Sequence, residues 1–285
     1  MLLPLLFILY MDYGLKRICR QVDNEHTLLY ADDAALIAGE GADLQEMLNR
    51  WDAQMGEIGM KMNTEKTEVM RIARERTELN INIEGRGLQQ VDKFKYLGVM
   101  MEGKGGQGGE IGERIKKFSQ NVGALYPVLK ETAIPKEVKM VIYKTILRPL
   151  LVYGSECWAL NTTQMRRVEA AEMRVLRLIE GVTLRDRRRS EEIRRELRIG
   201  SITEHIQQNQ LRWYGHLKRM EEGTGPRKML EWTPVGRRPA GRPKKRWKDA
   251  VEDAMNVRGV SMVDVEERRM YEDRNHWRRF CRGDT

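Results

Sequence analysis

The sequence predicts an α+β fold in which short strands near the N-terminus are followed by helices. Apolar residues flank an Asp-Asp pair near residue 32 in two short runs, which is typical of two strands joined by a turn. Beyond residue 111 the apolar residues recur at helical spacing instead. Glycines dominate residues 103–109, between these two patterns, and predict a flexible connection. We therefore expect a strand-containing first part and a helical second part.

The apolar residues 1–11 predict a helix that is buried in the first part. This segment carries no basic residue, contains Pro4 and lacks a small-residue cleavage site before Asp12, so it differs from a secretory signal peptide. Its eleven residues are too few to span a bilayer. Charged residues make up 33% of the chain, which also excludes a membrane protein.

Asp32 and Asp33 are the candidate metal ligands. Residues 28–30 run into this pair and residues 34–38 run out of it, so the sequence predicts two buried strands with the acids at their tip. Two like charges inside an apolar frame cost free energy unless a cation neutralises them, and Mg²⁺ prefers carboxylate oxygens. The pattern favours a magnesium site. The alternative is a surface hairpin whose acidic turn is solvated.

Four blocks in order resemble the reverse transcriptases of non-LTR (LINE-type) retrotransposons. They are residues 5–12, residues 29–36 with Tyr30-Ala31-Asp32-Asp33, residues 59–68, and Phe94-Lys95-Tyr96-Leu97-Gly98. The resemblance implies a partial palm at residues 1–102, built from an antiparallel hairpin plus helices. It further implies a glycine-rich connection at 103–110, a helical thumb with its extension at 111–200, and a basic nucleic-acid-binding region at 201–285.

The same resemblance implies roles for single residues. Asp32 corresponds to a ligand of Mg²⁺ in the parent enzyme, Asp33 to its weaker partner, and Tyr30 to a residue under the primer end. Lys66 corresponds to a proton donor to pyrophosphate, with an exposed lysine at a helix end as the alternative. The block with Phe94, Tyr96, Leu97 and Gly98 corresponds to the turn that grips the primer.

The family resemblance also implies that parts of the catalytic site are missing. Such polymerases hold two metal ions with bridging carboxylates, and one hairpin cannot hold both. The family's other metal-binding Asp and its fingers lie upstream of residues 5–12, and neither Asp12 nor Asp23 matches that ligand's place. We expect the parent enzyme to extend a DNA primer on an RNA template, and this chain alone to be inactive. The alternatives are a non-catalytic nucleic-acid-binding adapter and a retrotransposon relic.

Charge is distributed unevenly along the chain. Residues 1–110 hold 13 Lys and Arg against 18 Asp and Glu, whereas residues 111–285 hold 38 against 24. A balance of +14 in the second part suggests contact with a phosphate backbone, whose neutralisation releases counterions. The three cysteines and four histidines are scattered, which predicts a reducing compartment, no disulfide framework and no zinc finger.

Three helices are expected directly after the glycine-rich connection. The first carries Ile111, Ile115, Phe118 and Val122 on one face. The second begins near Pro135, buries Val138, Val141, Ile142 and Ile146, and ends at Pro149. The third is capped by Asn161, stops near Gly181, and carries Met165, Val168, Ala171, Met173, Val175, Leu176 and Ile179.

Two further segments carry aromatic or basic side chains. Residues 185–198 contain seven arginines and four acids, which fits either a nucleic-acid face or an ion-paired amphipathic helix. Trp213 and Tyr214 lie in residues 211–217, another segment recurrent in these retrotransposons. We expect them to pack in a core, and the alternative is that they stack on an unpaired base.

The most basic segment, residues 236–248, contains prolines and glycines that exclude a regular helix. Gly241-Arg242-Pro243 resembles the centre of an AT-hook, which binds duplex DNA in the minor groove. Nucleic-acid binding, nuclear import and an interdomain linker all remain open for this segment. Helices are expected after it, at 247–255 and around 262–277, and we expect the protein in the nucleus. The candidate contacts are Arg237, Arg238, Arg242, Lys244, Lys245 and Arg246.

Overall fold

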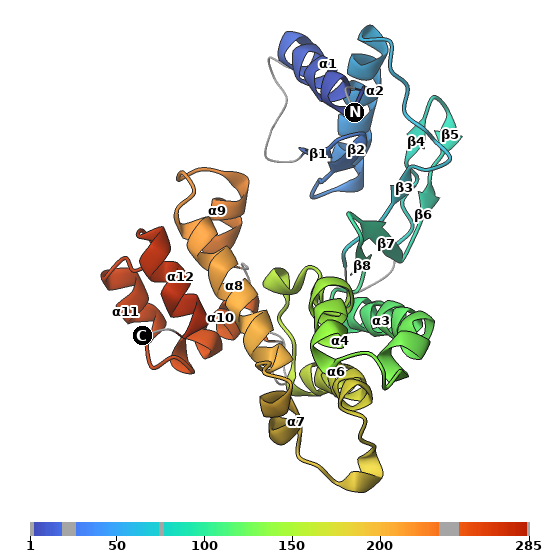
Figure 1. Cartoon of the computed structure of the whole chain (residues 1–285). Helices are drawn as coiled ribbons and strands as arrows, with labels where there is room; N and C mark the ends of the chain where they lie inside the picture. The colour runs from blue at the N-terminus through green and yellow to red at the C-terminus, as the bar shows by residue number, and fades with distance from the viewer. Residues whose placement is uncertain (1–2, 19–26, 74–76, 234–244, 284–285) are drawn as a thin grey trace. The chain divides into compact units, whose positions relative to one another are not determined.

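A computed structural model describes residues 3–18, 27–73, 77–233 and 245–283. The chain divides into two compact units, unit 1 (Met1–Gly105) and unit 2 (Gly106–Thr285), with the division inside the glycine-rich segment. Unit 1 mixes helices and short strands, whereas the described part of unit 2 is helical (Figure 1). The α+β class expected from the sequence is therefore found, with its strands in the first unit.

The described part of unit 1 contains two long helices and four small sheets of two strands each. The sheets pair β1 with β2, β4 with β5 and β7 with β8 as antiparallel hairpins, and β3 with β6 in parallel. The elements are α1 (Leu3–Ile18), β1 (Thr27–Tyr30), β2 (Asp33–Leu36), α2 (Gly41–Glu57), β3 (Glu68–Val69), β4 (Asn82–Ile83), β5 (Arg86–Gly87), β6 (Gln89–Gln90), β7 (Lys93–Tyr96) and β8 (Val99–Glu102).

Helix α2 supplies one face to two small hydrophobic clusters of unit 1. Leu48 packs with Val69 of β3, with Ile83 of β4 and with Ile81, which directly precedes β4. Trp51 and Met55, one and two turns further along the helix, pack with Met11 of α1. The Tyr10 hydroxyl also donates to the Ile58 carbonyl at 2.6 Å, which ties α1 to the end of α2.

The expected burial of residues 1–11 is wrong. The segment is helical, as predicted, but Met11 is its one side chain that the structure describes as buried. Sheets of two strands offer too little apolar surface to cover a whole helix face. Six apolar side chains of this helix are therefore 48 to 61% exposed, namely those of Leu5, Leu6, Ile8, Leu9, Tyr10 and Tyr13.

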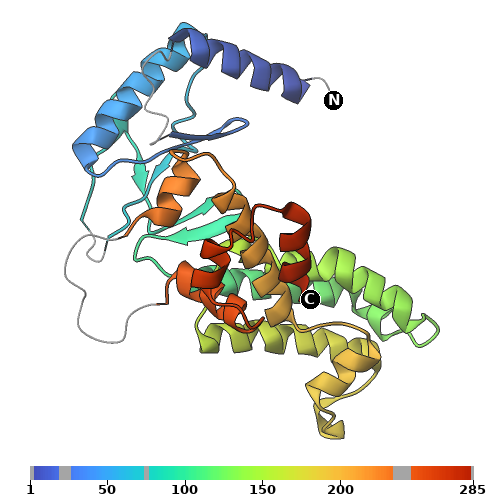
Figure 2. The same ribbon diagram turned by 90° about the vertical axis from the view of Figure 1, so that its left-hand side faces the viewer.

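Unit 2 is built from α-helices with short 3-10 and π segments (Figures 1 and 2). They are α3 (Gly108–Lys130), α4 (Lys136–Ile142), the π-helix η1 (Tyr143–Leu147), α5 (Arg148–Val152), the 3-10 helix η2 (Ser155–Cys157), α6 (Thr162–Glu180), the 3-10 helix η3 (Leu184–Asp186), α7 (Ser190–Glu196), α8 (Ile202–Lys218), α9 (Gly225–Glu231), α10 (Trp247–Asn256), α11 (Met262–Glu267) and α12 (Arg274–Arg282).

Two hydrophobic cores stabilise unit 2, and α8 contributes to both. The first core contains residues of all the α-helices from α3 through α7. It also receives Ile202 and Ile206 from the beginning of α8. The second core receives Leu211, Tyr214 and Leu217 from the rest of α8 and joins it to α9, α10, α11 and α12. Helix α8 therefore links the two halves of unit 2, and a hydrogen bond of 2.6 Å from the Trp247 indole N–H to the Glu156 carbonyl joins them as well.

The second expected helix differs from the structure in its end and in its buried face. Helical backbone continues through Pro149 to Val152, because the wider π turn of η1 lies where a proline would interrupt an α-helix. The buried face carries Met140, Tyr143, Leu147 and Leu151, while the expected Val138, Val141 and Ile146 are exposed. Two apolar stripes compete on this helix, and the bulkier one faces the core.

Buried polar contacts favour that choice of face. The Tyr143 hydroxyl donates to Glu172 Oε1 of α6 at 2.7 Å, and Arg194 of α7 contacts Glu172 Oε2 at 3.0 Å. Glu172 is fully buried. Burial and the Glu172 charge both raise the pKa of Tyr143, so its hydroxyl keeps the proton that it donates. The triad links three helices of the first core.

The third expected helix is confirmed. The Gln164 backbone N–H donates to Asn161 Oδ1 at 2.9 Å, and the Asn161 N–H donates to Gln164 Oε1 at 3.0 Å. This capping box begins α6, and Gly181 ends it in the left-handed conformation with φ 78°. Six of the seven expected residues are buried, and Met165 packs against them.

The expected helix at 247–255 is confirmed as α10, but residues 262–277 form parts of two helices, not one. Arg269 adopts a left-handed φ of 47°, which breaks the path after α11. Asp273 Oδ1 then accepts hydrogen bonds from the backbone N–H groups of Asn275 and His276 and starts α12. Among the described residues, no helix combines the length and apolarity that a membrane crossing requires.

Candidate active site and nucleic-acid interface

The Asp-Asp pair lies at the tip of the β1–β2 hairpin. Tyr30 pairs with Asp33 in the antiparallel register, so Ala31 and Asp32 form a two-residue loop. Ala31 has a φ of 53°, which is uncommon for a residue with a side chain. The turn between two strands is thus confirmed, and the two carboxylates follow each other at its tip.

The expected burial of this hairpin is wrong. Tyr30 is 63% exposed, Leu28 is 47% exposed, and both aspartates are also exposed. Two strands without a third leave much of both faces uncovered. Because the two carboxylates are not buried, the free-energy cost of burying like charges no longer argues for a bound cation. The hairpin in this structure agrees with the alternative of a solvated acidic turn.

The block of residues 94–98 forms a second hairpin. Phe94 and Tyr96 lie on β7 and are partly buried, and Tyr96 pairs with Val99 of β8. Leu97 and Gly98 form the turn with φ values of 47° and 82°. Positive φ at both central residues is the signature of a type I′ turn, which matches the twist of the flanking strands. Gly98 adopts this conformation without strain, whereas Leu97 does not.

The two hairpins interact electrostatically. Partial burial raises the pKa of the Tyr96 hydroxyl, and the negative charge of Asp33 raises it further. Asp33 and Tyr96 are far apart in the sequence, so the fold of unit 1 brings these two blocks within reach of each other. This interaction links candidate residues of the two hairpins.

The described residues do not make a complete magnesium site. Carboxylate oxygens are the donors that Mg²⁺ prefers, so Asp32 and Asp33 fit the ion in kind. Mg²⁺ takes about six ligands in octahedral geometry, and a two-metal centre needs further bridging acids. Across the described ranges, no group of three or more His, Cys, Asp or Glu side chains is placed to hold a metal. The donor set therefore does not fit a metal centre by itself.

Lys66 lies in a turn and not at a helix end, but it is exposed, as the alternative of a solvated lysine expects. Asn63 Oδ1 accepts hydrogen bonds from the backbone N–H groups of Glu65 and Lys66 at 3.1 and 3.2 Å, and the segment leads into β3. The Lys66 side chain is exposed. Within the described part of the chain, no ion pair joins it to Asp32 or Asp33.

A shallow pocket of about 330 Å³ lies at the other end of the second hairpin. Arg71, Lys93 and Lys104 line it together with Asp92 and Glu102. Lys93 and Glu102 close the open end of β7 and β8 through an ion pair of 3.1 Å, away from the Leu97–Gly98 turn. The pocket is therefore separate from the Asp-Asp pair.

Both hairpins fall within a match to a known family. Residues 2–101, nearly all of unit 1, match the family model described as reverse transcriptase (RNA-dependent DNA polymerase). Unit 1 resembles reverse transcriptases. The resemblance read from the four sequence blocks is thereby confirmed, since this reverse transcriptase-like unit contains all of them.

Three curated proteins extend the similarity beyond unit 1. A transposon-derived protein of Caenorhabditis elegans is 27% identical over 92% of the chain and 97% of its own length. The RNA-directed DNA polymerase from mobile element jockey of Drosophila melanogaster is 24% identical over 66% of the chain. A Drosophila melanogaster protein described as an RNA-directed DNA polymerase from transposon X-element is 25% identical over 61%.

The chain spans only about a fifth of the length of the two polymerases, 21% of jockey and 18% of X-element. The jockey alignment covers 198 residues, more than the segment 2–101 contains, so this similarity continues into unit 2. No solved structure matches the chain significantly.

The candidate contacts of the basic segment are only partly described. Arg237, Arg238, Arg242 and Lys244 lie outside the described residues. Lys245 forms an ion pair of 2.6 Å with Asp253 of α10, and Arg246 precedes α10 as its N-cap. Lys245 and Arg246 are therefore the candidate contacts of this segment that the structure describes.

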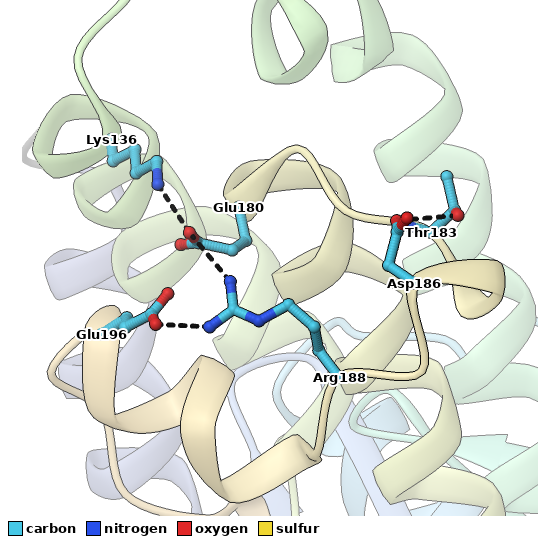
Figure 3. Close-up of polar contacts among 6 residues, drawn as sticks. All are labelled: Lys136, Glu180, Thr183, Asp186, Arg188 and Glu196. Carbon is cyan, nitrogen blue, oxygen red and sulfur yellow. Dashed lines mark hydrogen bonds and ion pairs between the residues drawn. The ribbon is translucent and has the colours of Figure 1, made fainter.

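The arginine-rich residues 185–198 divide into two groups. Arg188 contacts Glu196 and also reaches Glu180 at 3.7 Å, while Lys136 of α4 reaches the same Glu180 oxygen at 2.6 Å (Figure 3). Arg194 contacts the buried Glu172. The ion-paired interpretation therefore holds for these two arginines, although most of their partners come from α6 and not from the segment itself.

Sequence reasoning missed Glu172 and Glu180. Glu172 stands between two buried apolar residues on the predicted face of α6, and an acid at such a position indicates an internal partner. Glu180 is at the end of the same helix, where nothing in the local pattern indicates that two cations converge on it. Only the packing of α4 and α7 against α6 reveals that cluster.

The aromatic segment 211–217 packs as expected. Tyr214 is buried in the second core, and its hydroxyl donates to Glu266 Oε1 at 2.8 Å. Trp213 packs against the same core from its edge. The indole N–H of Trp277 donates to the Leu211 carbonyl at 2.9 Å, which holds α12 against α8.

Proposed function

We propose that this chain is part of an RNA-directed DNA polymerase of a mobile element and that the β1–β2 hairpin belongs to its nucleotidyl-transfer site. The match of residues 2–101 to reverse transcriptases is the observation that carries this proposal. The approach of Asp33 to Tyr96 supports it, because it joins the acidic hairpin to the proposed primer-gripping turn. RNA template and DNA primer are the proposed partners.

Each candidate residue has a proposed task in that parent enzyme. Asp32 and Asp33 contribute carboxylates to a Mg²⁺ site that other acids must complete. Tyr30, Phe94, Tyr96, Leu97 and Gly98 support the primer, and exposed Lys66 donates a proton to the leaving pyrophosphate. In this proposal residues 1–102 are a partial palm, 103–110 the connection, 111–200 the helical thumb and its extension, and 201–285 a basic region that contacts duplex DNA in the nucleus.

The chain by itself is proposed to be inactive. Phosphoryl transfer depends on positioned charges, and the described residues supply too few acids for a metal centre. Primer extension by the full chain with Mg²⁺ and deoxynucleoside triphosphates tests this point. We expect no extension product, and a product that disappears in Asp32→Ala would overturn the proposed inactivity.

A chimera tests the polymerase proposal itself. Residues 2–101 would replace the matching segment of the jockey polymerase, so that the rest of the domain is supplied by a complete enzyme. We expect the chimera to extend primers and Asp32→Asn to lower the rate by about 10³-fold or more, since removing one such charge costs several kcal/mol of transition-state stabilisation. Asp43→Asn, at an exposed acid in the first turn of α2, is the control that should keep activity. A folded chimera whose rate of primer extension does not change with Asp32→Asn would contradict the proposal.

A second candidate function is a non-catalytic nucleic-acid-binding adapter. The balance of +14 in residues 111–285 and the incomplete acidic site favour it. About five contacts from residues 237–248 would give a log-log salt slope near −4 to −5 on duplex DNA. The affinity for duplex DNA should depend on salt and fall when the basic side chains of this segment are neutralised. An affinity that does neither would exclude this role for the segment; the residues to neutralise are Arg237, Arg238, Arg242, Lys244 and Arg246. A relic without a selected role is the third alternative.

A further inference from the structure

Residues 185–198, which include the loop after α6 and helix α7, carry a set of arginines that bind no acid of the described residues. Among the described residues, Arg185, Arg187, Arg189, Arg195 and Arg198 make no ion pair or side-chain hydrogen bond, and all five are exposed. Within the part of the chain that the structure describes, Arg188 and Arg194 are the two of the seven that contact acids. The fold therefore leaves five guanidinium groups free for a partner.

The loop that presents three of them is well defined. Thr183 and Asp186 form a reciprocal cap around the 3-10 helix η3, with the Thr183 N–H and hydroxyl both donating to Asp186 Oδ2. These hydrogen bonds lower the pKa of Asp186, so the acid at the tip is engaged within the loop. Figures 1 and 2 both show this segment projecting from the helices of unit 2.

The ion-pair cluster at the base of the loop fixes its direction. Arg188 lies between Glu180 at the end of α6 and Glu196 at the end of α7, and Lys136 joins from α4 (Figure 3). Glu180 is 5% exposed, so this anchor is protected from solvent. Arg187 and Arg189 flank Arg188 directly in the chain. Anchoring the middle arginine leaves its two neighbours outside the cluster.

We propose that these five arginines form a binding surface for the phosphate backbone of nucleic acid. A guanidinium group binds a phosphate through two parallel hydrogen bonds, and backbone contacts position a protein without reading sequence. Nucleic acid fits better than an acidic protein, because regularly spaced phosphates match several separate arginines at once. The similarity to mobile-element polymerases also continues beyond residue 101. The surface does not depend on the proposed polymerase site, because binding requires neither Asp32 nor Asp33.

The triple variant Arg185→Gln, Arg187→Gln, Arg189→Gln in the full chain tests this surface. Fluorescence anisotropy with a labelled single-stranded RNA and a DNA duplex, each of about 20 nucleotides per strand, would be measured from about 50 to 200 mM salt. The salt slope should become shallower by about 2 to 3, since each lost phosphate contact removes about 0.7 to 0.9. Affinity should fall by about tenfold or more at the lowest salt.

A matched control separates this surface from the overall charge. The triple variant Lys61→Gln, Arg86→Gln, Lys104→Gln removes the same charge from exposed cations of unit 1, which form no ion pair within the described residues. Its affinity should change by less than about twofold. Equal losses in the two triple variants, or an unchanged slope in the loop variant, would overturn the proposal.

A variant that strengthens binding also tests the surface, because unfolding of the protein cannot explain a gain in affinity. Glu191 and Glu192 are exposed in the first turn of α7, beside the arginines, and would repel a phosphate backbone. Glu191→Gln with Glu192→Gln should therefore raise affinity several-fold at low salt, and this gain should vanish at high salt. No gain at low salt would count against the surface. All these readouts are binding measurements, so an inactive polymerase chimera leaves them unaffected.

Discussion

His205 on α8 is a partly buried base whose protonation opposes folding. Burial lowers its pKa to about 4, and the positive charges of Arg148 and Arg212 add to the effect. The unfolded chain binds a proton at this residue near pH 6.5, whereas the folded protein does not until about pH 4. The contribution of neutral His205 to the free energy of unfolding is therefore fully present above pH 6.5, and it is lost as the pH falls toward 4.

Urea unfolding between pH 7.5 and pH 4.5 measures this effect. We expect the free energy of unfolding to fall with pH across that window, and His205→Gln to make the fall smaller because glutamine does not titrate. His216 on the same helix is exposed, so His216→Gln serves as the control and should keep the pH dependence of the original protein. Parallel curves for all three proteins would contradict the assignment.

Gly215 is required by the close approach of α12 to α8. A Cβ atom at this position would lie 2.1 Å from Trp277 Nε1, whose N–H donates to the Leu211 carbonyl. The indole ring is enclosed in the second core and cannot move aside without losing that bond. Gly215→Ala should therefore lower the free energy of unfolding by about 1 to 3 kcal/mol.

Gly123 of α3 gives a matched control for this substitution. Nothing lies within 4 Å of a Cβ atom built there. Gly123→Ala should be neutral or stabilising by up to about 1 kcal/mol, because alanine favours the helix. Thermal or urea unfolding compares the two variants. A Gly215→Ala protein as stable as Gly123→Ala would show that α12 does not pack on α8 in this way.

At the scale of elements, the start of α6 depends on one side chain. Asn161 accepts from the Gln164 N–H and thereby satisfies one of the unpaired donors of the first turn. Asn161→Ala should lower the free energy of unfolding by about 1 kcal/mol. Thr163→Ala, two residues later at an exposed position, should cost less than about 0.5 kcal/mol. Equal effects of the two substitutions would exclude the cap.

Helices with one apolar stripe were predictable from the sequence, and helices with two were not. In α6 the cap, the stripe and the terminal glycine all agree, and the structure follows them. Residues 138–151 carry two stripes, and the core together with its acid Glu172 on another helix favours the one with Tyr143. The break between α11 and α12 depends on a left-handed Arg269, which no helical periodicity reveals.

The candidate site was predictable in its local geometry only. Asp-Asp between two apolar runs indicated the β1–β2 hairpin, and Leu97-Gly98 indicated the second turn. Burial of the hairpin was predicted wrongly, because the strand pattern does not reveal how many neighbouring strands are present. The approach of Asp33 to Tyr96 joins residues far apart in the chain, which only the fold brings together.

At the scale of the whole molecule, the two units should differ in independent stability. Unit 2 contains both large cores, whereas unit 1 has two small clusters and an exposed apolar helix. Residues 106–285 expressed alone should unfold cooperatively at the same temperature as they do in the full chain, as measured by circular dichroism. Residues 1–105 alone should aggregate, since their apolar surface is uncovered. A molten or unfolded 106–285 fragment would contradict this expectation.

Helix α8 also restricts which changes of length unit 2 tolerates. Ile206 faces one core and Leu211 the other, so the four residues between them set the angle at which the two halves meet. Each added residue turns a helix by about 100° and lengthens it by about 1.5 Å. A single insertion there would turn the second core, Tyr214 included, relative to the first core and break the hydrogen bond from Gln210 to the Trp158 carbonyl. The same insertion after Lys218, where the helix has ended, would leave the two cores in register.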